Sequence, residues 1–173
     1  MYKRQTNIFM FENLAFDGSV QDADGLESMT DGTFMENSSH DLSYNGRSYT
    51  YITGLLYAGQ ESGVSPYHLT SRILQEQGYD GHGSSISGTQ SGYSGYYNYY
   101  NIGASPSGGY TAVQNGLRYA SKSDSSLLRP WNTRMKSIIG GAIFIGKSYI
   151  NKGQDTLSVS YTHLRAHETK ANL

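Results

Sequence analysis

Glu76 is the carboxylate whose position in this 173-residue chain best suits acid catalysis. It falls at the C-terminal end of a predicted apolar helix, immediately before a segment rich in Gly and Tyr. Apolar neighbours favour the protonated form of a carboxyl, which a general acid needs near neutral pH. The alternative is a solvated glutamate in a last helical turn, and spacing alone leaves that alternative open.

Residues 78–109, which follow Glu76, carry the other groups that could take part in chemistry. Asp80 is the candidate second carboxylate, and tyrosines interleave with glycines through the rest of the segment. A tyrosine ring is apolar with a polar tip, which suits a ligand with both characters, such as a sugar. Gly/Ser bias is typical of flexible linkers. Because exposing so many aromatic rings is costly, we instead predict a structured loop region lined by tyrosines.

The composition excludes several other kinds of chemistry. The chain has no Cys, so disulfides, Cys-ligated zinc and thiol catalysis are ruled out. With 13 basic and 14 acidic residues the net charge is −1, which gives no general attraction for nucleic acid. No phosphate-binding glycine loop, zinc motif or calcium loop is present. His68 and His82 are isolated, so we expect no metal and no cofactor.

Four predicted helices would position these groups. Apolar residues recur at helical spacing in residues 49–61, 66–77, 111–121 and 133–150. Ser65 and Pro66 form a typical helix start, and Gly63 and Gly78 follow two of the helix ends. Glycines 140 and 141 would let another helix approach closely. Residues 1–47 are polar and rich in turn signals.

Several blocks along the chain resemble one family. Residues 63–78 (GVSPYHLTSRILQEQG) resemble the catalytic segment of autolysin-type bacterial N-acetylglucosaminidases, the glucosaminidase domain of glycoside hydrolase family 73. Residues 92–104 (GYSGYYNYYNIGA) are similar to that family's Asn-Leu-Phe-Gly-Ile-type motif in its clostridial variant. Residues 7–12, 129–134 and 148–157 fit the same variant. The resemblance therefore runs in order from about residue 7 to residue 157.

The resemblance implies a mainly α (α+β), lysozyme-like fold with the Gly/Tyr-rich loop region flanking a cleft. The family's catalytic glutamate closes the helix that follows the Gly-Val-Ser-Pro turn, which is Glu76 here. Glu61, in a Glu-Ser-Gly sequence, is a superficial match, but it precedes that turn. The position that matches Ser94 is often acidic in relatives, and this departure weakens a mechanism with two carboxylates. The residues expected to line the cleft and orient the sugar are Tyr96, Tyr97, Asn98, Tyr100 and Asn101.

The function implied is endo-β-N-acetylglucosaminidase cleavage of peptidoglycan glycan strands, in cell-wall turnover, autolysis or daughter-cell separation. Glu76 would act as the general acid, and the substrate's 2-acetamido group would act as the nucleophile. The alternatives are a non-catalytic glycan- or wall-binding module and an inactive enzyme fragment. We expect a monomer that is secreted or associated with the cell wall, although the sequence shows no signal peptide. No apolar run is long enough to span a membrane.

Three regions are expected along the chain. Residues 1–47 would pack on, or lead into, a glucosaminidase domain at residues 48–157, which the family pattern suggests is incomplete. Residues 159–169 (VSYTHLRAHET) resemble the translation of a transposase adapter used in sequencing libraries. Residues 158–173 are therefore expected to be a non-native tail, and no metal site is built from His163 and His167.

Overall fold

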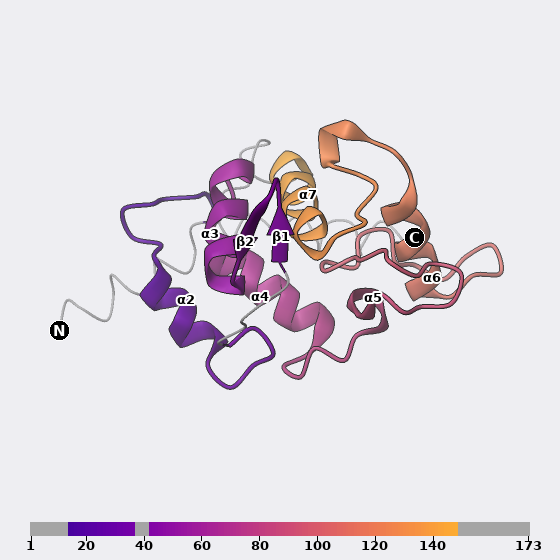
Figure 1. Cartoon of the computed structure of the whole chain (residues 1–173), viewed down its shortest axis with the longest axis horizontal. Coiled ribbons are helices and arrows are strands. Elements are labelled where there is room, and N and C mark those ends of the chain that lie inside the picture. Colours follow the sequence, from indigo (N-terminus) through magenta and orange to yellow (C-terminus); the bar gives the residue numbers. More distant parts are fainter. Residues whose placement is uncertain (1–13, 37–41, 149–173) are drawn as a thin grey trace, which may run out of the picture.

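Figure 1 shows the computed structural model of the chain, which describes residues 14–36 and 42–148. Its helices are α2 (Ala23–Thr30), α3 (Tyr51–Ser62), α4 (Pro66–Gln77), α5 (Ser84–Ser87), α6 (Ala112–Ser121) and α7 (Arg134–Ser148), with a 3-10 helix η1 (Ser125–Leu127). The strands β1 (Leu42–Tyr44) and β2 (Arg47–Tyr49) form one antiparallel hairpin. The predicted mainly helical α+β class is confirmed. The expected tail and the segment 7–12 lie outside the described residues.

Three of the four predicted helices, α3, α4 and α6, form where the sequence places them, and their ends carry strong local signals. Thr50 and Thr53 form a reciprocal capping box at the start of α3, and Gly63 ends that helix in the left-handed conformation. Ser65 accepts a hydrogen bond from the backbone N–H of His68 at the start of α4. A second capping box, formed by Thr111 and Gln114, starts α6.

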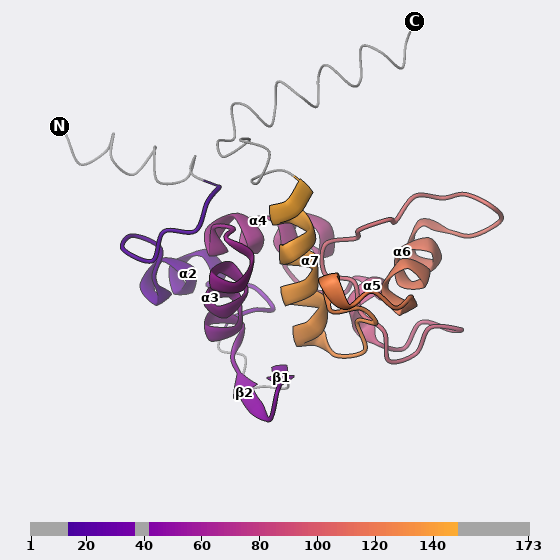
Figure 2. The same ribbon diagram turned by 90° about the horizontal axis from the view of Figure 1, so that it is seen from above.

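The core lies between α3, α4 and α7. Helix α3 packs against both α4 and α7, and α2 packs against α3 and α4. In Figure 1 the hairpin lies in front of these helices, and Figure 2 shows it extending from one side of the helical body. The α5 and α6 helices, with the long loops, lie on the far side of α7 from α3. Fully buried aliphatic residues at the centre are Leu55, Leu69, Ile73, Ile138 and Ile139.

Residues 14–36 and 42–49 contain more regular structure than the sequence analysis predicted. Asp22 caps α2 through the backbone N–H of Gly25, so the Asp24–Gly25 pair begins a helix rather than marking a turn. Gly25 is needed there because a Cβ atom would collide with the Tyr67 ring. Asn45 and Gly46 have φ values of 51° and 73°, which is typical of a tight two-residue hairpin turn.

The close approach predicted at Gly140 and Gly141 is present, and the neighbours are the end of the short 3-10 helix η1 and two loop residues. A Cβ at Gly140 would collide with the Leu127 carbonyl and the Trp131 indole, and one at Gly141 with the Tyr100 ring. The end of η1 and loop residues therefore pack directly on the backbone of α7. The predicted close contact is present, with a short 3-10 helix as one of its partners and loop aromatic rings as the others.

Candidate active site

Helix α4 positions Glu76 in its last turn. The helix is anchored by its buried face, where Leu69 and Ile73 are fully inaccessible to solvent. It ends at Gly78, whose N–H donates to the Leu74 carbonyl and whose φ is 75°. The helix axis and its end are thus both fixed, and the Glu76 side chain leaves the helix next to the Gly/Tyr-rich segment.

Two side chains hold the Glu76 carboxyl from opposite oxygens. Asn101 Nδ2 donates to Glu76 Oε2 at 3.1 Å and to the Glu76 backbone carbonyl at 3.3 Å. Arg72 Nη2 lies 3.5 Å from Oε1, one helical turn earlier on α4. The Glu76 side chain is 27% exposed and the Arg72 side chain 40%. The carboxyl is therefore oriented by the protein and still reachable from solvent, as a general acid must be.

Gln77, next to Glu76, fastens α4 to the segment that carries Asn101. Its side chain is buried, and its Nε2 donates to the backbone carbonyls of Asn98 and Tyr99 at 3.3 and 2.9 Å. Its Oε1 accepts from the Ser85 hydroxyl at 3.1 Å. The sequence analysis missed Gln77, since nothing in a helical pattern distinguishes a buried Gln from a solvated one. It also missed Arg72, although the i, i+4 spacing to Glu76 was a usable signal.

Asn98 and Tyr100, predicted to line the cleft, have buried side chains. Asn98 Nδ2 donates to the carbonyls of Ile102 and Gly116, and its Oδ1 accepts from the Ile102 N–H. The Tyr100 hydroxyl donates to the Ile138 carbonyl at 3.2 Å, and the ring lies on Gly141. Burial also raises the pKa of Tyr100 far above its ordinary value. In this structure both residues hold the loop in place, and neither offers surface to a ligand.

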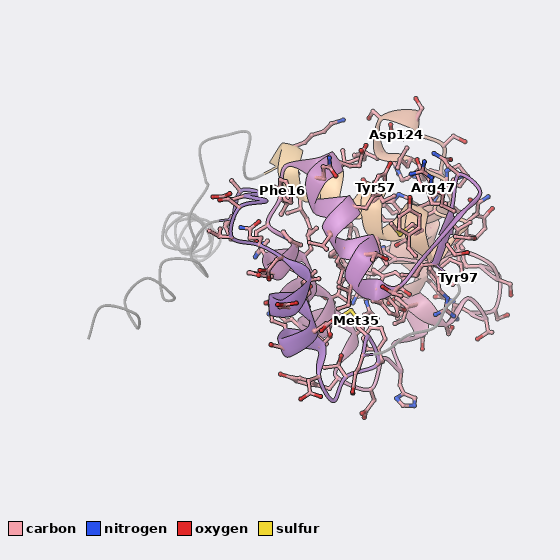
Figure 3. All side chains as sticks on the ribbon, turned by 60° about the vertical axis from the view of Figure 1, so that its left-hand side comes forward. Phe16, Met35, Arg47, Tyr57, Tyr97 and Asp124 are labelled. Carbon is pink, nitrogen blue, oxygen red and sulfur yellow. The ribbon has the colours of Figure 1, made fainter. Side chains whose placement is uncertain are left out.

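Tyr96 and Tyr97 are partly exposed and stay candidates for sugar contact. The Tyr97 ring packs over Gly88, and the Arg134 guanidinium lies 5.4 Å from its centroid. Figure 3 shows Tyr97 on the loop side of the molecule, away from Met35. Neither tyrosine hydrogen-bonds to Glu76 in the described part of the chain.

The remaining titratable groups near α4 differ strongly in exposure. Asp80 is exposed on the turn that follows Gly78, and Glu61 is exposed in the last turn of α3. Burial lowers the pKa of His68 to about 4, and the positive charge of Arg72 adds to the effect. His82 is exposed. Within residues 14–36 and 42–148 no group of three His, Cys, Asp or Glu side chains could hold a metal ion.

A hollow of about 580 Å³ lies elsewhere, between α2 and the start of α3. Its lining includes Glu27, Asp31, Met35 and Ile52, and does not include Glu76. Because size alone assigns no chemistry, we place the candidate active site at Glu76, where a carboxyl is held by specific partners.

The fold, but not the function, is shown by comparison with known proteins. No protein-family model matches the sequence, and a search of curated proteins finds no match. The structure is similar to a solved structure titled "Crystal structure of Major Bifunctional Autolysin", with a TM-score of 0.55 and 24% sequence identity. The similarity covers 84% of this chain and 52% of that one. The chain has an autolysin-like fold, and it spans about half the length of that protein.

None of the described helices is long and apolar enough to cross a membrane.

Proposed function

We propose that this chain is an endo-β-N-acetylglucosaminidase that hydrolyses the glycan strands of peptidoglycan, with Glu76 as the general acid. The observation that carries the proposal is the carboxyl itself. It sits at the end of a helix with one buried face, is contacted on its two oxygens by Asn101 and Arg72, and keeps a solvent-accessible side. The fold shared with an autolysin supports the substrate class.

In the reaction we favour, the protein contributes one essential carboxyl. Glu76 donates its proton to the leaving glycosidic oxygen as the bond from that oxygen to C1 of the sugar breaks. The carbonyl oxygen of the substrate's own 2-acetamido group attacks C1 and closes a ring. Water then opens that ring, and the Glu76 carboxylate takes the proton from water, which restores the acid.

Tyr96 and Tyr97 are the side chains we propose for contact with the sugar. Each keeps part of its ring exposed, and Tyr97 is fixed between Gly88 and Arg134. A rigid ring of this kind can stack on the apolar face of an N-acetylglucosamine unit at little cost in conformational entropy. The substrate lies outside the cell membrane, so we propose that the protein acts secreted or bound to the wall, as a monomer.

The test compares two glutamates in the same chain. Purified wild type, Glu76→Gln and Glu61→Gln are incubated with peptidoglycan, and new reducing ends are counted and identified by mass spectrometry. We expect Glu76→Gln to lower kcat by at least about a thousandfold, within the range for loss of a general acid. Glu61→Gln, an exposed match on α3, should stay within about twofold of wild type.

Three results would contradict the proposal. Loss of activity in Glu61→Gln, with Glu76→Gln still active, would show that the general acid is Glu61 on α3. Reducing ends on N-acetylmuramic acid instead of N-acetylglucosamine would show that the enzyme cuts the other glycosidic bond of the strand. Wild-type protein that sediments with peptidoglycan but releases no reducing ends would identify a glycan-binding module.

A further inference from the structure

The contacts of Asn101 point to a role different from the sugar contact predicted from the sequence. We propose that Asn101 is a positioning residue for the acid. It keeps Oε2 of Glu76 as a hydrogen-bond acceptor, so that the proton delivered to the substrate is carried on Oε1. The inference rests on the proposed function, because it assigns a role within the same site.

Both N–H donors of the Asn101 amide are directed at one residue. The amide nitrogen Nδ2 lies 3.1 Å from Glu76 Oε2 and 3.3 Å from the Glu76 backbone carbonyl oxygen. The reversed amide would place Oδ1 against two acceptor oxygens, so the orientation with nitrogen toward Glu76 is the one that the contacts support. With both donors engaged, Nδ2 has none left for a sugar. The amide instead ties the carboxyl to the helix end.

This arrangement makes the two oxygens of the carboxyl different. A protonated carboxyl has one hydroxyl oxygen and one carbonyl oxygen, and the carbonyl oxygen is the better acceptor. An amide N–H can only donate, so the oxygen it contacts is the one without the proton. That oxygen is Oε2, which leaves Oε1 to carry the proton.

Arg72 leaves Oε1 free to act. Its Nη2 is 3.5 Å from Oε1, at the limit of a hydrogen bond, and its Nε has no hydrogen-bond partner among residues 14–36 and 42–148. A guanidinium has no lone pair to accept a proton. The O–H of a protonated Glu76 therefore cannot donate to Arg72, which leaves its proton for a substrate.

The backbone at Asn101 explains why this residue type suits the position. Its φ is 49°, in the left-handed region that Asn, Asp and Gly adopt most readily. Gly would keep the backbone and remove the amide, while Asp would keep the backbone and replace the donor by a carboxyl. These two substitutions separate the chemistry of the side chain from the shape of the loop.

The experiment measures kcat, KM and the pH profile of kcat for wild type, Asn101→Gly, Asn101→Asp and Glu76→Gln on peptidoglycan fragments. Thermal unfolding is recorded for each variant. We expect Asn101→Gly to lower kcat about 10- to 100-fold with KM within about twofold, because a misdirected acid slows the chemical step and not binding. Asn101→Asp should move the alkaline limb of the profile to higher pH, because two adjacent carboxyls share a proton.

The outcomes separate this inference from the proposed function. An Asn101→Gly variant with wild-type kcat, or with a raised KM and unchanged kcat, overturns the positioning role, and the second result restores the sugar contact. If Asn101→Gly unfolds at the assay temperature, the pH profile of Asn101→Asp decides, and a profile identical to wild type overturns the role. Activity in Glu76→Gln overturns the proposed function itself, whatever Asn101 does.

Discussion

The ends of α3 and α4 are alike in sequence and differ in structure. Both helices have 12 residues, both place a glutamate in the last turn, and both end at a glycine with positive φ. Glu61 on α3 is exposed, and its charge adds to the effect of burial in raising the pKa of Tyr57. Glu76 on α4 is partly buried and held by Asn101 and Arg72.

The difference comes from chain segments that lie far along the sequence. Asn101 is 25 residues beyond Glu76, and the bonds from Gln77 to the Asn98 and Tyr99 carbonyls bring it there. At the end of α3 the neighbour is α7, where Gly146 lies against the Ser62 carbonyl. The end of α4 thus becomes a candidate active site because a loop is packed on it, and Arg72 and Gln77 of the helix itself complete the arrangement.

Acid should destabilise α4 in a way that has no counterpart in α3, which contains no histidine. His68 has its pKa lowered from 6.5 to about 4, first by burial and then by Arg72. Between pH 6.5 and about 4, His68 is protonated in the unfolded chain and neutral in the folded chain. His68 therefore does not lower the free energy of unfolding above pH 6.5. Between pH 6.5 and about 4 it lowers that free energy progressively, by up to about 3 kcal/mol.

Urea unfolding of wild type and His68→Gln at pH 7, 5.5 and 4.5 measures this contribution. The wild type should lose more free energy of unfolding over this range than His68→Gln does. His82→Gln removes an exposed histidine and should behave as wild type. Equal pH dependence in wild type and His68→Gln would show that His68 is not buried as a neutral group.

Gly63 and Gly78, the glycines that end α3 and α4, should differ in their tolerance of asparagine. Gly63 has φ 72° and ψ 14°, a left-handed cap that Asn adopts at little cost. Gly78 has φ 75° and ψ 168°, a region essentially restricted to Gly. A Cβ at either position meets no atom, so only the backbone is tested. We expect Gly78→Asn to lower the free energy of unfolding by about 2 kcal/mol.

Gly63→Asn should lower the free energy of unfolding by less than about 1 kcal/mol, measured by urea unfolding of both variants. Gly78→Asn should also lower activity, because the turn after Glu76 moves with it. Equal losses for the two variants would mean that the end of α4 adjusts as freely as the end of α3.

Much of the helical framework was predictable because its signals are local. Ser65, Pro66 and Gly78 mark the ends of α4, and the structure begins and ends that helix where they indicate. The prediction that residues 78–109 form a structured region is also confirmed, since Asn98 N–H donates to Ser85 O at 2.8 Å and Tyr99 is fully buried. Helix α2 was missed, because a close contact with Tyr67, and not a turn, requires Gly25.

The candidate site was only partly predictable. Glu76 could be singled out from its place at a helix end and from the family resemblance, but the direction of each loop side chain could not. Asn98, Tyr99 and Tyr100 are three consecutive buried residues, and the burial of Asn98 and Tyr100 depends on carbonyls of α6 and α7 that no local pattern reveals. A Gly/Tyr-rich segment has no period of 2 or 3.6 from which an inward face can be deduced.

The smallest effect on activity should come from substitution of Asp80, the carboxylate on the turn that follows α4. Asp80 is exposed. In the mechanism we favour, the 2-acetamido group of the sugar is the nucleophile, so Asp80→Asn should keep kcat within about twofold of wild type on peptidoglycan fragments. The decisive control is sodium azide. A large loss of kcat that azide restores, with a glycosyl azide among the products, would show that Asp80 acts as base or nucleophile. The end of α4 would then supply two catalytic carboxylates, and the mechanism with a single acid would be wrong.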